Sequence, residues 1–408
     1  MRARGAVIGI DARAADPVPT GLTTYARELV RAITTIGREH SFVVIRRPDS
    51  GLPFAEGPNV RELLKAGDAS TPTPAGRIST LGLDLYHSVH HFLPFGLRAP
   101  RIVVTLHDLI WLEHPELIRS GPSAFATRWI THLYARAAMT HAIARADRVI
   151  AISGHTAERA QAYFGLPSER IDVVHHGVAH DKFRPAGAPI RPKPDPAAVD
   201  AAGGERYFLC VGNSKPYKNL ATAVRAFAIC ANALPGVKLF VAGRGDGEAE
   251  VTRLARQLGV LGRVRFCGNA SVPALVDLLH GAIALIFPSL VEGFGLPVLE
   301  AMAAGCPVVA SDCAPVAEVA GSGALLCDPH SPQAFAAAMT RLATDASAAA
   351  DLRRRGIARA AGFTWARCAE QTLDVYERLL SAPDMGGAGL RVERSGLCEP
   401  AEERTQRA

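Results

Sequence analysis

The sequence lacks the marks of several protein classes. Its 8 cysteines include no C-x-x-C pair, and most of them lie in or beside apolar segments. This pattern is typical of reduced, buried thiols in a cytosolic enzyme rather than of a disulfide framework or a zinc site. The chain also has no run of about 18 apolar residues, and the apolar run after its basic start, MRARG, is too short for a signal peptide. We therefore expect a cytoplasmic protein in which no segment crosses a membrane.

The composition is that of an ordinary globular protein with a mild excess of positive charge. Of the 408 residues, 48% are hydrophobic and 21% are charged, which predicts two or three domains with substantial cores. The net charge of +6 and the pI near 9.0 favour anionic partners such as phosphates, nucleotides or a lipid surface. A charge excess this small does not indicate a protein that binds nucleic acid.

Continuous apolar segments alternate with helical patterns along most of the chain. The predicted strands are residues 6–11, 42–45, 83–86, 102–106, 149–152 and 171–174, and then 207–211, 237–242, 264–266, 283–287 and 307–310. The main predicted helices are residues 22–36, 123–146, 155–164, 220–233, 248–258 and 272–279. Because these strands are continuously apolar rather than alternating, they predict parallel sheets that are covered on both faces.

A proline-rich segment divides this alternation into two halves. Five prolines and the pair Gly203 and Gly204 lie between residues 183 and 205, as expected of a linker. We therefore predict an α/β protein with two doubly wound, Rossmann-like domains that face each other across a cleft. The predicted units are a first domain (1–185), the linker (186–204), a second domain (205–362), a closing helix that packs back toward the first domain (363–381) and a disordered tail (382–408).

Residues 288–312, PSLVEGFGLPVLEAMAAGCPVVASD, contain the best candidate site. A strand leads into a glycine-rich loop and then a short helix, with Pro297 at its start and Gly305 at its end. Free backbone N–H groups and the positive end of a helix dipole meet in such a loop, which suits an anion. Two carboxylates, Glu292 and Glu300, flank the loop. Taken alone, Glu300 could equally well only complement the helix dipole, and Glu292 could equally well be a solvated loop acid.

The spacing of these two glutamates occurs in a longer pattern that resembles a known family. The segment S-L-x-E-G-F-G-L-P-x-L-E-A-M-A-x-G-x-P-V-V-A-S-D is similar to the E-x7-E signature of retaining glycosyltransferases of family 4, which have the GT-B fold. Other segments agree with that family in the expected order: TGLTTYARELVRAI from Thr20, VTLHDLIWLEHPE from Val104, FLCVGNSKPYKNL from Phe208, and LFVAGRGDGE from Leu239. The resemblance covers about residues 6–381.

The resemblance implies a role for each part of a nucleotide diphosphate sugar site. Lys218 would contact the diphosphate, Glu300 would accept hydrogen bonds from the ribose hydroxyls, and Glu292 would hold the hydroxyls of the donor sugar. Backbone groups of the glycine-rich loop would complete the donor site, namely those of Gly293, Phe294, Gly295 and Leu296. A carboxylate suits vicinal hydroxyls because it accepts two hydrogen bonds in one plane.

Other residues are implicated less directly. Many relatives carry an arginine where this chain has Asn213, so the resemblance leaves open whether Lys215 supplies the second cation or is a solvated loop lysine. His107 matches the histidine that lies beside the reacting centre in the family, with Asp108 as an orienting partner rather than a base. Gly21 would let the first loop approach the donor phosphate or the acceptor, although an ordinary turn explains it nearly as well.

We expect no metal and no cofactor. No D-x-D sequence occurs, so the divalent-metal clamp of the other large glycosyltransferase fold is missing, and Lys218 with the loop N–H groups is its natural replacement. Five further histidines have strand–loop spacings without carboxylate partners and are more typical of structural residues than of metal ligands. They are His87, His90, His91, His175 and His176.

The predicted helix 123–146 is basic. Arg119, Arg128, Arg136, Arg145 and Arg148 lie on it or beside it, with Phe125 and Trp129 among them. One hypothesis is that this face docks on anionic membrane and so brings a lipid-linked acceptor to the cleft. A solvated helix face is the other interpretation.

The sequence therefore predicts a metal-independent, retaining transfer of a hexose, with mannose as our guess, from a nucleotide diphosphate sugar. The acceptor would be a sugar or a lipid-linked glycan, and the protein would be cytoplasmic, with peripheral membrane contact as a hypothesis. A sugar-nucleotide epimerase or a phosphorylase of the same architecture is one alternative, although these lack the E-G-F-G loop followed by the second glutamate. A non-catalytic binder of glycans or nucleotide sugars is the other.

Overall fold

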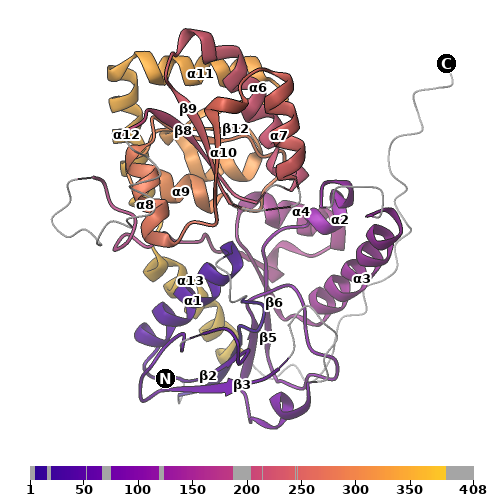
Figure 1. The fold of residues 1–408 in the computed structure, drawn as a ribbon. Helices are drawn as coiled ribbons and strands as arrows, with labels where there is room; N and C mark the ends of the chain where they lie inside the picture. Colours follow the sequence, from indigo (N-terminus) through magenta and orange to yellow (C-terminus); the bar gives the residue numbers. More distant parts are fainter. Residues whose placement is uncertain are drawn as a thin grey trace.

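A computed structural model describes residues 5–15, 20–51, 53–66, 75–118, 124–186, 204–213, 215–243, 245 and 247–382. Within these residues the chain forms two parallel β-sheets, each flanked by helices, and one sheet lies above the other in Figure 1. Most of the linker predicted at 186–204 and nearly all of the tail predicted at 382–408 lie outside the described residues, as does Cys398.

The first domain contains a seven-stranded sheet in the order β3-β2-β1-β4-β5-β6-β7, and every strand pair is parallel. Its strands are β1 (Val7–Asp11), β2 (Ser41–Arg46), β3 (Val60–Leu64), β4 (Leu85–Ser88), β5 (Ile102–Leu106), β6 (Arg148–Ala151) and β7 (Ile171–Val173). Its helices are α1 (Gly21–Ile36), α2 (Ile110–Glu113), α3 (Ala124–Arg145) and α4 (Gly154–Phe164). The strand order reverses at β1 and β4, and ligands bind at such a switch point in doubly wound sheets.

The second domain repeats this design with a six-stranded parallel sheet in the order β10-β9-β8-β11-β12-β13. Its strands are β8 (Tyr207–Val211), β9 (Lys238–Ala242), β10 (Val264–Gly268), β11 (Leu285–Phe287), β12 (Val308–Ser311) and β13 (Leu325–Cys327). Its helices are α6 (Leu220–Cys230), α7 (Glu248–Gln257), α8 (Val272–Gly281), α9 (Leu296–Ala303), α10 (Ala314–Ala320), α11 (Pro332–Thr344) and α12 (Ala346–Ala360). The order reverses at β8 and β11, the strands that precede Lys218 and Glu292.

Burial explains why these segments form strands. All residues of β4, β5, β11 and β12 are buried, because helices cover both faces of each sheet. Local side chains fix where the helices start. The hydroxyls of Thr20, Ser153 and Ser271 accept hydrogen bonds from the backbone N–H three residues later, at the N-termini of α1, α4 and α8.

The last described helix, α13 (Trp365–Ser381), leaves the second domain and packs along α1 of the first (Figure 1). The Tyr376 hydroxyl lies 2.5 Å from His87 Nδ1 on β4, and the Arg101 guanidinium donates to the Leu379 carbonyl at 3.2 Å. Tyr376 and His87 are both fully buried, so this contact belongs to the core between α13 and the first sheet.

The sequence predicted the fold class and most strands correctly but missed β3 and β13. The segment VRELL pairs with β2 at the edge of the first sheet, and its residues are only partly buried. Its charged residues interrupt the continuous apolar pattern by which the other strands are recognised. None of the described helices combines the length and low charge that a bilayer-spanning helix needs.

Candidate active site

The glycine-rich loop predicted at residues 292–296 connects β11 to α9. Gly295 is the N-cap of α9, and its backbone φ of +101° is a conformation that glycine adopts without strain. No side chain caps this helix, so the positive end of its dipole is left for another group. The loop and the start of α9 therefore have the geometry predicted for an anion site.

Lys218 and Glu292, which the sequence assigns to the diphosphate and to the donor sugar, contact each other. Lys218 ends a short 3₁₀ turn after β8, and its ammonium donates to Glu292 Oε1 at 2.7 Å. Both side chains are largely buried, with exposed fractions of 13% and 11%. Burial lowers the pKa of Lys218, but the Glu292 carboxylate together with Tyr217 and Asp108 more than offsets this effect, and the pKa is raised. Lys218 is therefore a fixed positive charge.

Glu300 lies on α9, one turn or more beyond the loop. Burial raises the pKa of its carboxyl to about 8, and the nearby Lys182 ammonium opposes the shift. Lys182 is itself paired with Glu28 of the first domain at 2.6 Å. No hydrogen bond to the Glu300 carboxyl comes from the residues that the structure describes. Both of its oxygens are therefore available to hydroxyl groups of a ligand.

The loop after β8 also brings Asn213 and Lys215 to this region. Asn213 Oδ1 accepts a hydrogen bond from the Lys215 backbone N–H at 3.4 Å, so Asn213 shapes the loop. The Lys215 ammonium is close enough to Asp108 of the first domain to lower the pKa of that carboxyl. Burial dominates, however, and the pKa of Asp108 is raised to about 6. Asp108 Oδ1 accepts from the Ile110 N–H at 3.0 Å, a contact that orients the start of α2.

The two domains meet where Gly293 of the second lies against His107 of the first. A Cβ atom added to Gly293 would overlap the His107 carbonyl oxygen, so only glycine fits at this contact. His107 follows β5, and its Nε2 lies 2.8 Å from the Val89 carbonyl. Burial lowers the pKa of His107 to about 4, although the Val89 hydrogen bond opposes the shift. The imidazole is therefore neutral. The backbone carbonyl of His107 points at the glycine-rich loop.

Gly21 and Leu296 begin the two helices that face each other across this junction. Gly21 is the first residue of α1, and a Cβ at this position would lie 3.5 Å from a methyl group of Leu296, the first residue of α9. The structure therefore brings together all of the predicted residues: Gly21 and His107 from the first domain, with Asn213, Lys215, Lys218, the 292–296 loop and Glu300 from the second.

Of the five histidines noted in the sequence, His87 and His91 lie in the buried core of the first domain. His87 is held by Tyr376 at one ring nitrogen and by Thr105, 2.8 Å away, at the other. Burial lowers the pKa of His87 and of His91 to about 3, so both are neutral. These side chains fill the core behind the site.

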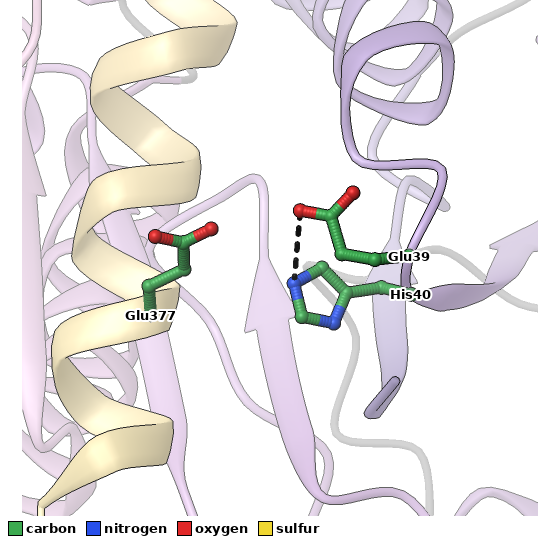
Figure 2. A group of neighbouring side chains, drawn as sticks. All are labelled: Glu39, His40 and Glu377. Atoms are coloured by element: carbon green, nitrogen blue, oxygen red, sulfur yellow. Dashed lines mark ion pairs between the residues drawn. The ribbon is translucent and has the colours of Figure 1, made fainter. Parts of the chain in front are cut away.

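Among the described residues, one group has the spacing of a metal site: Glu39, His40 and Glu377 (Figure 2). It lies at the amino end of β2, the edge of the sheet away from the site. His40 Nδ1 accepts a hydrogen bond from the Ala6 N–H at 3.2 Å, so the proton of the neutral ring is on Nε2. Because Nε2 is the atom that faces the carboxylates, it has no lone pair to give a metal. The Nε2–H of His40 instead faces the Glu39 carboxylate, with Nε2 3.8 Å from Oε1.

Sequence reasoning missed several residues that join the domains. The Ser153 hydroxyl of the first domain donates to the Gly293 carbonyl at 2.9 Å. The Glu318 carboxylate of the second domain accepts a hydrogen bond from the backbone N–H of Gly154 in the first. His176 stacks on Tyr25, with ring centroids 4.6 Å apart, and its centroid is 4.9 Å from that of Phe294. Neither ring nitrogen of His176 has a partner among the described residues. Only the position of Ser153 at a predicted helix start could have drawn attention to it.

Two family matches together span most of the chain. Residues 19–182 match the family "Glycosyltransferase Family 4", and residues 193–359 match "Glycosyl transferases group 1". The chain is also similar to the O-antigen chain mannosyltransferase B of Escherichia coli, with 27% identity over 301 residues that cover 72% of this chain and 74% of that protein. It is 30% identical over 326 residues to the D-inositol 3-phosphate glycosyltransferase of Streptomyces griseus, covering 73% of this chain and 67% of that protein.

The fold agrees with these matches. The structure of Anabaena HepE in complex with UDP-glucose superposes with a TM-score of 0.65 and 19% identity, over 91% of this chain and 100% of that one. The two parallel sheets, the loop with its two glutamates and the matches together define a glycosyltransferase of the GT-B fold. The chain belongs to family 4, the group 1 glycosyltransferases, whose members are retaining enzymes that use nucleotide sugars.

Proposed function

We propose that the protein transfers a hexose from a nucleotide diphosphate sugar to an acceptor hydroxyl, with retention of the anomeric configuration and without a metal. The observation that carries this proposal is the contact between Lys218 and Glu292 at the N-terminus of α9, opposite His107. If Lys218 holds the diphosphate and Glu292 holds the sugar, a separation of 2.7 Å between them puts the bond to be broken directly beside the pair.

The leaving diphosphate is stabilised by fixed positive charge. As the bond to the anomeric carbon breaks, negative charge grows on the β-phosphate, and the Lys218 ammonium and the N–H groups from Gly293 to Leu296 are aimed at it. Lys215 lies on the same loop and supplies a second cation when the donor is bound, which accounts for a neutral Asn213. Gly21 lets the N-terminus of α1 approach the phosphates.

The remaining donor contacts fall to the two glutamates. Glu300 accepts hydrogen bonds from both ribose hydroxyls, and this role is supported by the absence of a hydrogen-bond partner for its carboxyl among the described residues. Glu292, with the backbone of Gly293, Phe294 and Gly295, holds the hydroxyls of the sugar. The donor must displace part of the contact between Lys218 and Glu292 as it binds.

Retention follows from attack on the same face as the departing phosphate. The acceptor hydroxyl gives its proton to the leaving phosphate oxygen as the new glycosidic bond forms. The His107 carbonyl lies beside the anomeric carbon, where its partial negative charge stabilises the positive charge on the sugar. A covalent intermediate on Glu292 is less well supported, because the ion pair with Lys218 weakens that carboxylate as a nucleophile.

The donor sugar is mannose in this proposal. Similarity to O-antigen mannosyltransferases supports mannose, although the inositol-phosphate relatives have comparable similarity. A thermal-shift screen against GDP-mannose, UDP-glucose, UDP-galactose and UDP-N-acetylglucosamine, with EDTA present, tests this choice. The preferred donor raises the melting temperature most. A larger shift with any UDP-sugar than with GDP-mannose would refute mannose.

The acceptor is a lipid-linked glycan, delivered at a membrane surface that contacts α3. This 22-residue helix contains no acidic residue, and its described part exposes Leu133, of which 60% is accessible, and Arg136. The exposed Phe95, at 52%, lies beside His141 of α3 with ring centroids 5.6 Å apart. An apolar surface flanked by arginine suits an anionic bilayer.

Three of the arginines named with the predicted helix 123–146 do not support a membrane-binding face on α3. Arg119 and the side chain of Arg128 lie outside the described residues, and so do the side chains of Phe125 and Trp129. Arg148 is held by the Glu169 carbonyl and lies 3.6 Å from Asp172, so it is not available to a membrane.

Vesicle co-sedimentation tests the membrane contact. The protein should sediment with vesicles that contain phosphatidylglycerol at low salt, and the double variant Leu133→Ser/Arg136→Glu should bind them several-fold less. Vesicles of phosphatidylcholine alone are the control for charge. If the native protein does not sediment with anionic vesicles at low salt, the membrane contact is wrong.

A further inference from the structure

A carboxylate of the second domain caps a helix of the first. Glu318 lies on α10, and its two oxygens accept hydrogen bonds from the backbone N–H of Gly154 at 2.9 and 3.0 Å. The N–H of His155 is 3.4 Å from the same carboxylate. Gly154 is the first residue of α4, and Figure 1 shows α4 at the junction of the two domains. The α4 dipole therefore attracts an acid that belongs to the other domain.

A second group of the first domain binds the same carboxylate. His175, in the loop after β7, has its Nε2 2.6 Å from Glu318 Oε1. Burial raises the pKa of Glu318, but the His175 hydrogen bond and the α4 N–H groups more than offset this effect, and the pKa is lowered. Glu318 is therefore ionised, and two separate elements of the first domain hold it.

The helix that carries Glu318 packs directly on the glycine-rich loop, residues 292–296, which we call the donor loop. A Cβ at Gly295 would lie 3.3 Å from a methyl group of Val316, so α10 supports the loop from behind. On the other side, Ser153, the N-cap of α4, donates to the Gly293 carbonyl at 2.9 Å. The N-terminus of α4 thus contacts the donor loop directly through Ser153 and indirectly through Glu318 and α10.

These contacts hold the two domains in the arrangement in which the loop touches His107. We propose that Glu318 is a positioning residue for glycosyl transfer: by capping α4 and binding His175, it holds α10 and the donor loop against the first domain. When the domains separate, Glu318 leaves α4 and the Gly293 contact with His107 is lost. The kinetic part of this inference rests on the proposed transfer, whereas the effect on domain closure does not.

Asp345 provides a matched control for Glu318. It caps α12 by accepting a hydrogen bond from the Ala348 N–H at 2.9 Å, and both residues belong to the second domain. Replacing either carboxylate removes a helix cap, but only Glu318 joins the two domains. A merely structural cap would therefore give the same result at both positions.

The experiment compares the native protein with Glu318→Ala, Glu318→Gln and Asp345→Ala. Small-angle X-ray scattering of each protein, alone and with saturating UDP or GDP, measures the radius of gyration and hence domain closure. Steady-state kinetics with the preferred donor separate KM from kcat. Circular dichroism shows whether each variant folds. If Glu318→Ala does not fold, Glu318→Gln, which keeps an acceptor oxygen, takes its place in the comparison.

We expect Glu318→Ala to have a larger radius of gyration than the native protein and a kcat/KM lower by at least about tenfold, a loss typical of charge-assisted hydrogen bonds. Glu318→Gln should be intermediate, and Asp345→Ala should lower only the melting temperature. Unchanged scattering and kinetics in a folded Glu318 variant would overturn the inference, and so would equal effects of Asp345→Ala. If the native protein turns over no donor, the proposed function fails, but scattering still tests the role of Glu318.

Discussion

The Lys218 ammonium donates to the Glu292 carboxylate at 2.7 Å, across the gap between the loop after β8 and the loop before α9. These loops follow the two strands at which the order of the second sheet reverses. One half of this pair is suited to a phosphate and the other to a sugar hydroxyl. The pair therefore holds the loop before α9 in shape. If the donor binds here as we propose, its binding exchanges one set of charged contacts for another.

Removing Lys218 should abolish most of the activity. Lys218→Ala removes the only cation paired with Glu292 among the described residues, and we expect kcat/KM to fall about 100- to 1,000-fold, or ~3–4 kcal/mol of transition-state stabilisation. Donor turnover measured as nucleoside diphosphate release checks this. Lys238→Ala is the control, because Lys238 is paired with Glu205 in a more exposed position away from the site. Equal losses in the two variants would argue against a specific role for Lys218.

The raised pKa of Glu300 predicts that donor affinity depends on pH. Below a pKa of about 8 the free enzyme holds Glu300 protonated. In the role we propose, only the carboxylate that forms above this pH accepts hydrogen bonds from both ribose hydroxyls. Nucleoside diphosphate affinity should therefore rise between pH 7 and pH 9, as isothermal titration calorimetry can measure. Glu300→Gln should bind more weakly and lose this rise. A native affinity that is flat over this range would contradict the role of Glu300.

The same shift predicts an effect of Glu300 on stability. The pKa in the folded state lies above the ordinary value of 4.5, so the unfolded state loses its proton first as the pH rises. The contribution of Glu300 to the free energy of unfolding is thus greatest at low pH and falls as the pH rises from about 5 to 8. Glu300→Gln should have a higher melting temperature than the native protein at pH 8, and a difference that does not grow between pH 5 and pH 8 would count against this account.

The contact between Gly293 and His107 predicts a severe effect of a single methyl group. Gly293→Ala puts a Cβ atom on the His107 carbonyl oxygen, so the domains cannot keep their closed arrangement. We expect kcat/KM to fall at least about 100-fold, since small displacements of reacting groups have effects of this size. Gly262→Ala is the control, because a Cβ there meets nothing within 4 Å. Native kinetics for Gly293→Ala would show that the closed contact is unnecessary.

The buried hydroxyl of Tyr376 predicts a loss of stability without a loss of chemistry. Tyr376→Phe leaves His87 Nδ1 without its partner at 2.5 Å, which should lower the free energy of unfolding by about 1–3 kcal/mol. Urea denaturation measures this, and Tyr163→Phe is the control, because no hydrogen bond to the Tyr163 hydroxyl comes from the described residues. Donor turnover should remain near the native value. A large kinetic defect with unchanged stability would contradict a purely structural role for Tyr376.

The sequence predicted the fold well because the strands of a covered parallel sheet carry their own signal. Strand β5, IVVTL, is apolar along its whole length because both of its faces are buried. Strand β3, VRELL, pairs at a sheet edge and has charged residues, so no such signal exists. Helix starts with Thr20 and Ser153 were predictable from local capping.

The site was predictable only in part, for a similar reason. Lys218, Glu292 and Glu300 occur in motifs with fixed spacing, and the structure brings them to one end of the second sheet. The contacts of Glu318 with Gly154 and His175 join residues more than a hundred positions apart. No local sequence pattern predicts such contacts. These contacts become apparent only when the two folded domains are placed together.

Release of nucleoside diphosphate from a panel of nucleotide sugars, with EDTA present, tests the central claim most directly. The native protein should release diphosphate from one preferred donor at a rate that EDTA does not change, and Lys218→Ala should reduce that rate at least about 100-fold. The sugar released at first should keep its anomeric configuration, as NMR can detect. Release that EDTA abolishes, or that Lys218→Ala leaves unchanged, would contradict a metal-independent transfer centred on Lys218 and Glu292.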